Sequence, residues 1–180
     1  MKLTNLIQVA LALTFLMTSL ASEGRACDRY QALLSRGHLE IGVKFDTNNQ
    51  RFKEAAAEAL NYWAGQLDLA WREDSDDRTC SIEFRPAEFG VRADSHDMLA
   101  MAHLPDHAKY DGVVYFRLLA HYDAQQVFIH ELGHLFGLEH SDTRNSPMYF
   151  QPENAGVTLT SSELRQLAKH HKLALALIAE

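Results

Sequence analysis

Three histidines stand close together in the segment HELGHLFGLEH, which covers residues 130–140, and one glutamate lies between the first two of them. Residues four apart share one face of an α-helix, so His130 and His134 are expected to direct two ring nitrogens toward one point. Two nitrogens placed in this way are typical of a zinc site, in which each lies about 2 Å from the metal. Glu131 lies beside the first histidine, where its carboxylate can contact a metal-bound water without binding the metal.

The third histidine becomes useful only if the chain turns sharply after the helix. Gly137 permits the positive φ angle that ends a helix in such a turn, and the turn can return His140 as a third ligand. Three protein ligands leave one position open, which distinguishes a catalytic zinc from a structural one. Zinc lowers the pKa of its bound water toward about 7, and Glu131 would accept that proton and pass it to a leaving amine. The spacing therefore predicts peptide-bond hydrolysis rather than a helix that is merely rich in histidine.

The elements that must position these residues follow from the periodicity of apolar side chains. Helical spacing covers residues 124–137, and residues 50–67 form a longer amphipathic helix with its charges on one side. A last helix is expected over 158–180, with Thr160 and Glu163 as its capping box. Strands are expected over residues 39–46, 69–73, 80–86, 98–105 and 112–119. This order predicts an α+β domain in which helices pack against a mixed sheet.

The first 21 residues differ from the rest of the chain. Lys2 is followed by an uncharged, largely apolar run over residues 6–21, and small residues come next. This pattern predicts a signal peptide that is cleaved after Ala21 or as late as Ala26. The alternative of a retained membrane anchor is disfavoured because the apolar run is shorter than the roughly 20 residues that a span requires. Residues 22–180 then form one domain, and the protein is expected to be secreted or periplasmic.

The charge balance and the cysteines limit the partners and the compartment. The formal net charge of −7 disfavours binding to nucleic acid or to anionic membranes, so neither is expected as a partner after signal removal. The chain has two cysteines, Cys27 and Cys80. An even count in an exported chain predicts one disulfide, with a functional free thiol as the alternative.

Two motifs resemble those of a known family. HELGHLFGLEH fits the HExxHxxGxxH pattern of the metzincin metalloproteases, and SPMY, at residues 146–149, resembles the metzincin turn that carries a methionine. Within the metzincins, Ser141 and the spacing from His140 to Met148 resemble the matrixins. The segments LAMAHLP and GVVYF are similar to two consecutive matrixin strands, so the resemblance covers nearly all of the chain after the signal.

The resemblance implies a zincin-like fold and a way to bind substrate. The fold would be a twisted mixed sheet with the active-site helix and the long helix packed on it, followed by a small C-terminal subdomain with the methionine turn and the closing helix. An extended peptide or protein substrate would pair antiparallel with the edge strand. The residues in contact with it would be Leu99, Ala100, Met101 and Ala102. Met148 would form a hydrophobic floor below the zinc, and Gln126 and Phe150 would line the pocket for the side chain after the scissile bond.

The sequence departs from the matrixin pattern at three places, so some properties of the matrixins are not expected in this protein. Met101 and Tyr115 stand where matrixins have histidines for a structural zinc, and residues 117–120 read RLLA where acidic residues bind calcium. We therefore expect one catalytic Zn²⁺, with no support for a structural zinc or for calcium. The residues around Cys27 also lack the flanking pattern of the family's zinc-capping cysteine, so the disulfide to Cys80 is favoured over a zinc-capping thiolate. Restraint of activity would then require a separate protein inhibitor.

The sequence as a whole predicts a secreted, monomeric, matrixin-like zinc metalloendopeptidase, and the compact domain favours a bacterial source. One alternative is a zinc-bearing binding module without turnover, which the intact Glu131 disfavours. Another is a peptidase that acts on cell-wall peptides, which an open cleft with a free edge strand disfavours.

Overall fold

The computed structural model describes residues 39–67, 69–73, 81–87, 98–103, 112–118, 122–151 and 155–171. The predicted signal peptide, Cys27 and Cys80 lie outside these residues, so cleavage and the disulfide stay predictions. Among the helices of the described part, none is both long and apolar enough to cross a membrane.

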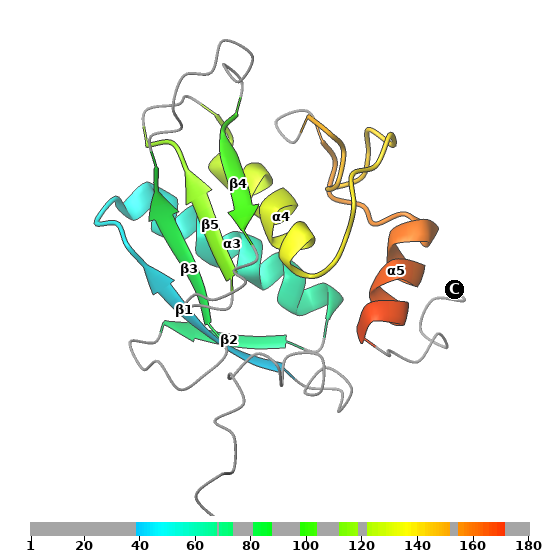
Figure 1. Cartoon of the computed structure of the whole chain (residues 1–180), viewed down its shortest axis with the longest axis horizontal. Helices are drawn as coiled ribbons and strands as arrows, with labels where there is room; N and C mark the ends of the chain where they lie inside the picture. Colours follow the sequence, from blue (N-terminus) through cyan, green and yellow to red (C-terminus); the bar gives the residue numbers. More distant parts are fainter. Residues whose placement is uncertain are drawn as a thin grey trace, which may run out of the picture.

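A five-stranded mixed sheet forms the centre of the described structure (Figure 1). Its strands are β1 (Leu39–Phe45), β2 (Leu69–Glu73), β3 (Ser81–Pro86), β4 (Ala100–His103) and β5 (Gly112–Phe116). Their spatial order is β2-β1-β3-β5-β4. The first four strands in this order run parallel, whereas β4 pairs antiparallel with β5 at one edge. The predicted mixed sheet is thus confirmed, and β4 and β5 are shorter than the predicted 98–105 and 112–119.

Helices α3 (Gln50–Gln66) and α4 (Ala124–Leu135) cover one face of this sheet (Figure 1). Side chains alternate between the two faces of a strand, and Phe84 of β3 and Phe116 of β5 point toward the helices. Phe128 of α4 lies between them, with its ring centroid 5.2 Å from each. Phe52 of α3 completes the cluster, 4.9 Å from Phe116. The aromatic core therefore fixes α4 against the middle of the sheet.

The long helix α3 also supports α4 directly. Trp63 is fully buried between the two helices and packs its indole 5.3 Å from the ring of Phe136. The indole N–H donates to the carbonyl of Ile129 at 2.9 Å, and Ile129 is the residue before the first of the three histidines. A buried indole requires such a partner, and here the partner is the backbone of the helix that carries the motif.

The chain after α4 forms a smaller C-terminal part that ends in α5 (Ser161–His171) (Figure 1). The predicted capping box is confirmed: Glu163 N–H donates to Thr160 Oγ1 at 3.2 Å, and Thr160 N–H donates to Glu163 Oε2 at 2.6 Å. Leu167, one turn later, is buried in the common hydrophobic core. The C-terminal part is therefore anchored to the rest of the domain by apolar packing and not only by its connection to α4.

Candidate metal centre and active site

Helix α4 ends in the turn that the sequence predicts. Gly137 has a φ angle of 90°, a left-handed conformation that side-chain-bearing residues rarely adopt. Its N–H donates to the carbonyl of His134 at 3.0 Å, and Leu138 N–H donates to the carbonyl of Gly133 at 3.0 Å. These two bonds form a Schellman motif, in which the chain reverses direction immediately after the helix. Gly137 thus returns the chain so that His140 comes back toward α4.

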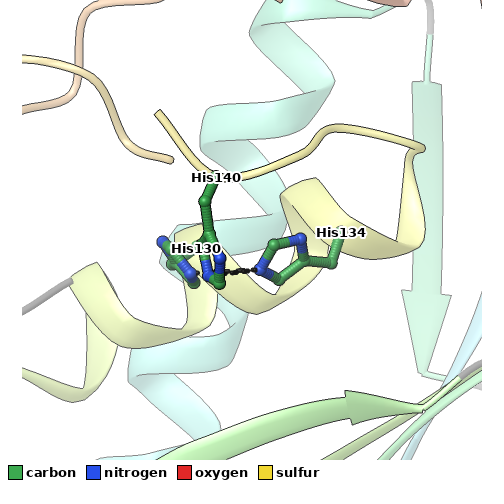
Figure 2. A group of neighbouring side chains, drawn as sticks. All are labelled: His130, His134 and His140. Atoms are coloured by element: carbon green, nitrogen blue, oxygen red, sulfur yellow. Dashed lines mark hydrogen bonds between the residues drawn. The ribbon is translucent and has the colours of Figure 1, made fainter. Parts of the chain in front are cut away.

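The three histidines converge on one point (Figure 2). The Nε2 atom of His134 lies 3.1 Å from Nε2 of His130 and 3.2 Å from Nε2 of His140. Three nitrogens on a tetrahedral zinc with bonds of about 2 Å would be roughly 3.3 Å apart, so the observed spacing suits this metal. The predicted convergence is confirmed, and among the described residues these three form the group able to hold a metal ion.

The other ring nitrogens show which atoms are free to bind a metal. His130 Nδ1 lies 2.9 Å from the carbonyl oxygen of Pro147, and His134 Nδ1 lies 2.9 Å from that of Leu138. A carbonyl oxygen only accepts hydrogen bonds, so each Nδ1 carries the ring proton and donates it, which leaves a lone pair on each Nε2. Two lone pairs at this separation repel each other unless a cation lies between them. The donor set therefore fits a bound zinc ion.

Burial keeps two of the rings in the form that a metal requires. The pKa of His130 is lowered to about 4, chiefly by burial and next by the neighbouring His134, with the smallest contribution from His140, while the hydrogen bond to Pro147 acts in the opposite direction. Burial also lowers the pKa of His134. Only the neutral imidazole binds a metal, so His130 and His134 are ready for zinc at neutral pH without losing a proton.

Glu131 is the acidic group of the site. Its side chain is buried, and its Oε2 atom accepts the backbone N–H of Ala102 in β4 at 2.5 Å. Burial raises the pKa of Glu131 to about 7, although the hydrogen bond from Ala102 acts in the opposite direction. In the described part of the chain, no basic side chain forms an ion pair with this carboxylate. A carboxyl group with such a pKa can accept and release a proton near neutral pH.

Met148 lies directly beneath the histidine helix. It is fully buried, and a Cβ atom added at Gly133 would lie only 2.3 Å from its sulfur. The motif therefore needs glycine at position 133 so that this side chain can approach the helix between the two histidines. Ser141 N–H donates to the Met148 carbonyl at 2.7 Å, which ties the turn after His140 to the methionine segment.

In β4, the candidate substrate-binding strand, the backbone N–H and C=O groups of successive residues point to opposite sides of the strand. Leu99 C=O accepts Arg117 N–H at 3.0 Å, which continues the pairing with β5. The N–H of Ala102 points the other way, toward Glu131. Ala100 has the same orientation as Ala102, since residues two apart in a strand are equivalent. The outer edge of β4 thus faces the metal centre, and the side chain of Met101 is exposed.

The two residues predicted to line a side-chain pocket lie in different surroundings. The amide of Gln126 donates to the carbonyl of Gly156 at 2.9 Å, so this side chain connects α4 to the segment before α5. Phe150 is exposed and packs its ring 4.5 Å from that of Tyr149. Their role as pocket residues stays a prediction.

The structure also describes the two strands in which matrixins carry histidines for a structural zinc. Met101 of β4 and Tyr115 of β5 are direct partners in the antiparallel register. The thioether and the phenol therefore lie side by side where the resemblance would place two histidines. The expectation of a single zinc stays a prediction, as does the absence of calcium.

Several contacts of the site were not predicted from the sequence. The carbonyls of Pro147 and Leu138 orient two ligands, yet any residue type supplies a carbonyl, so no sequence pattern indicates them. Trp63 is recognisable only as part of the apolar face of α3, and its hydrogen bond to Ile129 depends on how two helices pack.

The fold and the site together define a class of protein: a mixed sheet carries a helix with two metal-ligating histidines and a glutamate, and a glycine turn supplies the third histidine. This is the arrangement of a zinc hydrolase centre with one open coordination position. The family model described as Matrixin, a peptidase family, matches residues 40–170, and the chain therefore belongs to the matrixin family of zinc metalloproteases. A search of curated proteins found no match.

Proposed function

We propose that this protein is a secreted zinc metalloendopeptidase that cleaves peptide bonds within extended peptide or protein chains. The observation that carries the proposal is the convergence of three histidine nitrogens on one point, with the buried carboxyl group of Glu131 on the helix that carries His130 and His134. Membership of the matrixin family supports the same activity. Secretion rests on the signal-peptide pattern of residues 1–21.

The Nε2 atoms of His130, His134 and His140 would hold the metal. When bound, zinc lowers the pKa of a water molecule and polarises the carbonyl group of the scissile bond. The protein's own residues prepare this site, because the backbone carbonyls of Pro147 and Leu138 fix the tautomer and the ring orientation of two ligands.

Glu131 carries the proton in the proposed mechanism. Its carboxylate accepts a proton from the attacking water and then delivers it to the nitrogen of the departing amine. A pKa raised to about 7 suits both directions of transfer at neutral pH. The N–H of Ala102 holds the carboxylate in place from β4, so the base is aligned with the strand on which substrate would lie.

The outer edge of β4 is the proposed substrate-binding element. An extended peptide would add to this edge as a further antiparallel strand, and its backbone would bond to the outward groups of Ala100 and to the C=O of Ala102, whose N–H holds Glu131. Their small side chains allow a close approach of the peptide. Recognition through the substrate backbone favours cleavage within a chain, because it does not require a free terminus.

The proposal is tested with protein that begins at Ser22, compared with its Glu131→Gln variant. Zinc is measured per protein molecule, and both proteins are incubated with a mixed peptide library, an unfolded protein and purified cell-wall peptides. We expect about one zinc in each protein and cleavage by the wild type alone. Glu58→Gln, an exposed glutamate on α3, is the matched control and should cleave like the wild type. Equal background cleavage by all proteins would refute the proposal, and cleavage of cell-wall peptides alone would refute its substrate class.

A further inference from the structure

Tyr122 joins the start of helix α4 to the end of strand β5. It is buried, and it stands immediately before Asp123, whose side chain caps α4. Its hydroxyl group donates to the carbonyl of Arg117 at 3.0 Å, just beyond the end of β5. Burial raises the pKa of the phenol, so this group keeps its proton and acts as a donor at neutral pH. The helix of the metal centre is therefore connected to the sheet by a side-chain hydrogen bond.

Arg117, which accepts this bond, also holds the candidate substrate-binding strand. Its N–H donates to the carbonyl of Leu99 at 3.0 Å, and Leu99 stands directly before β4. Near the other end of β4, the N–H of Ala102 donates to Glu131 of α4. The strand is thus attached to α4 at both ends, directly through Ala102 and indirectly through Arg117 and Tyr122. Two attachments fix the tilt of the strand as well as its distance from the helix, whereas one would let it pivot.

Helix α3 in turn fixes the position of Tyr122. The Nη2 atom of Arg51 donates to the backbone carbonyl of Tyr122 at 2.8 Å. The ring of Phe52, the next residue of α3, lies 6.2 Å from the tyrosine ring, measured between the centroids. Tyr122 is therefore held by a helix of the hydrophobic core and not by the exposed edge of the sheet.

The two attachments of β4 act on different parts of a bound peptide. In the proposed pairing, the scissile bond lies near Ala102, because the carboxylate of Glu131 is held there. Antiparallel strands run in opposite directions, so the residues of β4 before Ala102 lie beside the substrate residues that follow the scissile bond. The attachment through Tyr122 is at this end of the strand, at Leu99.

We propose that Tyr122 is a positioning residue for the substrate, which holds the N-terminal end of β4 at the distance from α4 that the peptide after the scissile bond requires. This inference rests on the proposed function and adds to it a residue that contacts neither the metal nor the substrate. Because the attachment affects binding of the peptide and not the chemical step, its loss should change KM and leave kcat unchanged.

The test compares Tyr122→Phe with Tyr62→Phe. Tyr62 is the matched control, because its hydroxyl also donates to a backbone carbonyl, that of Val157 at 2.9 Å, but away from β4. Two peptides with the same sequence around the scissile bond are used, one ending shortly after it and one extended by several residues. The wild type and Tyr62→Phe should bind the extended peptide with the lower KM. In Tyr122→Phe, KM for the extended peptide should rise about fivefold, the factor expected for one ordinary hydrogen bond, with kcat and zinc content unchanged.

Amide hydrogen exchange tests the attachment itself in the metal-free protein. Exchange of the Arg117 N–H should be about fivefold faster in Tyr122→Phe and unchanged in Tyr62→Phe. Thermal unfolding establishes that each variant is folded. If Tyr122→Phe does not fold, Arg51→Gln replaces it, because this change keeps the tyrosine ring in the core and removes the bond to its backbone. The KM for the extended peptide should then rise in Arg51→Gln.

Three results would overturn the inference while leaving the proposed function intact. One is a wild-type KM for the extended peptide in folded Tyr122→Phe. Another is an equal rise of KM in Tyr62→Phe, which would show a general loosening of the fold. The third is a wild-type enzyme that gains nothing from the extension, which would place the peptide elsewhere. If the wild type cleaves no peptide, the proposed function fails as well, and hydrogen exchange at Arg117 then shows separately whether Tyr122 holds the strand.

Discussion

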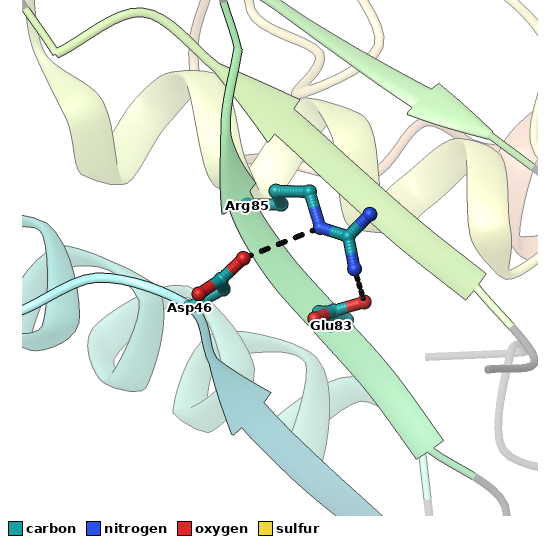
Figure 3. A network of polar contacts seen from close by, with 3 residues as sticks. All are labelled: Asp46, Glu83 and Arg85. Carbon is teal, nitrogen blue, oxygen red and sulfur yellow. Dashed lines mark hydrogen bonds and ion pairs between the residues drawn. The ribbon is translucent and has the colours of Figure 1, made fainter. Parts of the chain in front are cut away.

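Two buried glutamates, Glu83 and Glu131, differ in how their charge is compensated. Glu83 lies in β3 and points away from the helices, since its neighbour Phe84 packs against Phe128 on the other face. Its Oε2 atom accepts a hydrogen bond from the guanidinium group of Arg85 at 2.8 Å (Figure 3). This bond raises the pKa of Arg85, which keeps the guanidinium charged.

Glu131 is nearly as buried, but among the described residues its carboxylate accepts a hydrogen bond only from the backbone N–H of Ala102. Its pKa rises to about 7 because burial disfavours the charged form, and in the described part of the chain no cation offsets this cost. Burial alone therefore does not give a carboxylate a pKa that suits proton transfer. A buried carboxylate with a cationic partner stabilises a sheet, and one without such a partner is available for chemistry.

The largest expected effect is the difference in enzymatic activity between variants of Glu131 and Glu83. Glu131→Gln should lower kcat/KM by about 10³-fold, the typical contribution of a general acid or base, while zinc binding persists. Glu83→Gln should leave kcat/KM of the folded protein within about threefold of the wild type, because its contacts lie on the opposite face of the sheet from α4. Steady-state kinetics on a peptide found with the library measures both. A comparable loss in the two variants would break the comparison.

The next effect concerns the ion pair between Glu83 and Arg85 and its contribution to the stability of the fold. Arg85→Met should destabilise the fold by about 2 kcal/mol, because it leaves a buried carboxylate without its cation, and the partial exposure of Arg85 reduces the effect. The double variant Glu83→Gln/Arg85→Met should recover most of this loss. Urea unfolding of the zinc-free proteins gives the free energies. Additive effects of the two substitutions would contradict the pairing shown in Figure 3.

The last effect concerns the stability of the metal-free protein and its dependence on pH. The folded-state pKa of Glu131, about 7, is above its ordinary value of 4.5, so ionisation of this group opposes folding. The penalty is complete above pH 7 and disappears as the pH falls to 4.5. Relative to the wild type, Glu131→Gln should therefore gain roughly 3 kcal/mol of stability between pH 4.5 and pH 8, which is the free energy that the shift in pKa represents. Unfolding curves at both pH values measure it, and the histidines are common to both proteins. A difference that does not change with pH would contradict the raised pKa.

Much of the metal centre was predictable because its geometry is local. The spacing of His130 and His134 fixes their common face, and Gly137 is the residue type that a reversal of the chain requires. These properties depend on a few consecutive residues, which a sequence displays directly. The capping box at Thr160 was predictable for the same reason.

The supporting contacts were not predictable because they join distant segments. The parallel pairing of β1 with both β2 and β3 depends on connections of many residues, which a hydrophobic pattern does not specify. Glu83 and Arg85 share one face of a predicted strand, yet the sequence does not tell that the glutamate is buried. The hydrogen bond between Arg51 and Tyr122 likewise exists only after two segments have packed together.

The close packing of Met148 against Gly133 has a consequence for oxidative damage. Oxidation would attach an oxygen atom to a sulfur that already lies where even a Cβ atom on the helix could not fit. Met148 is fully buried, so an oxidant can reach its sulfur only while the segment around Met148 is transiently detached from α4, and the added oxygen then opposes the return of the segment to the helix. The rate at which dilute peroxide inactivates the protein would therefore measure how often this segment opens. Recovery of the native protein would require a reductase for methionine sulfoxide.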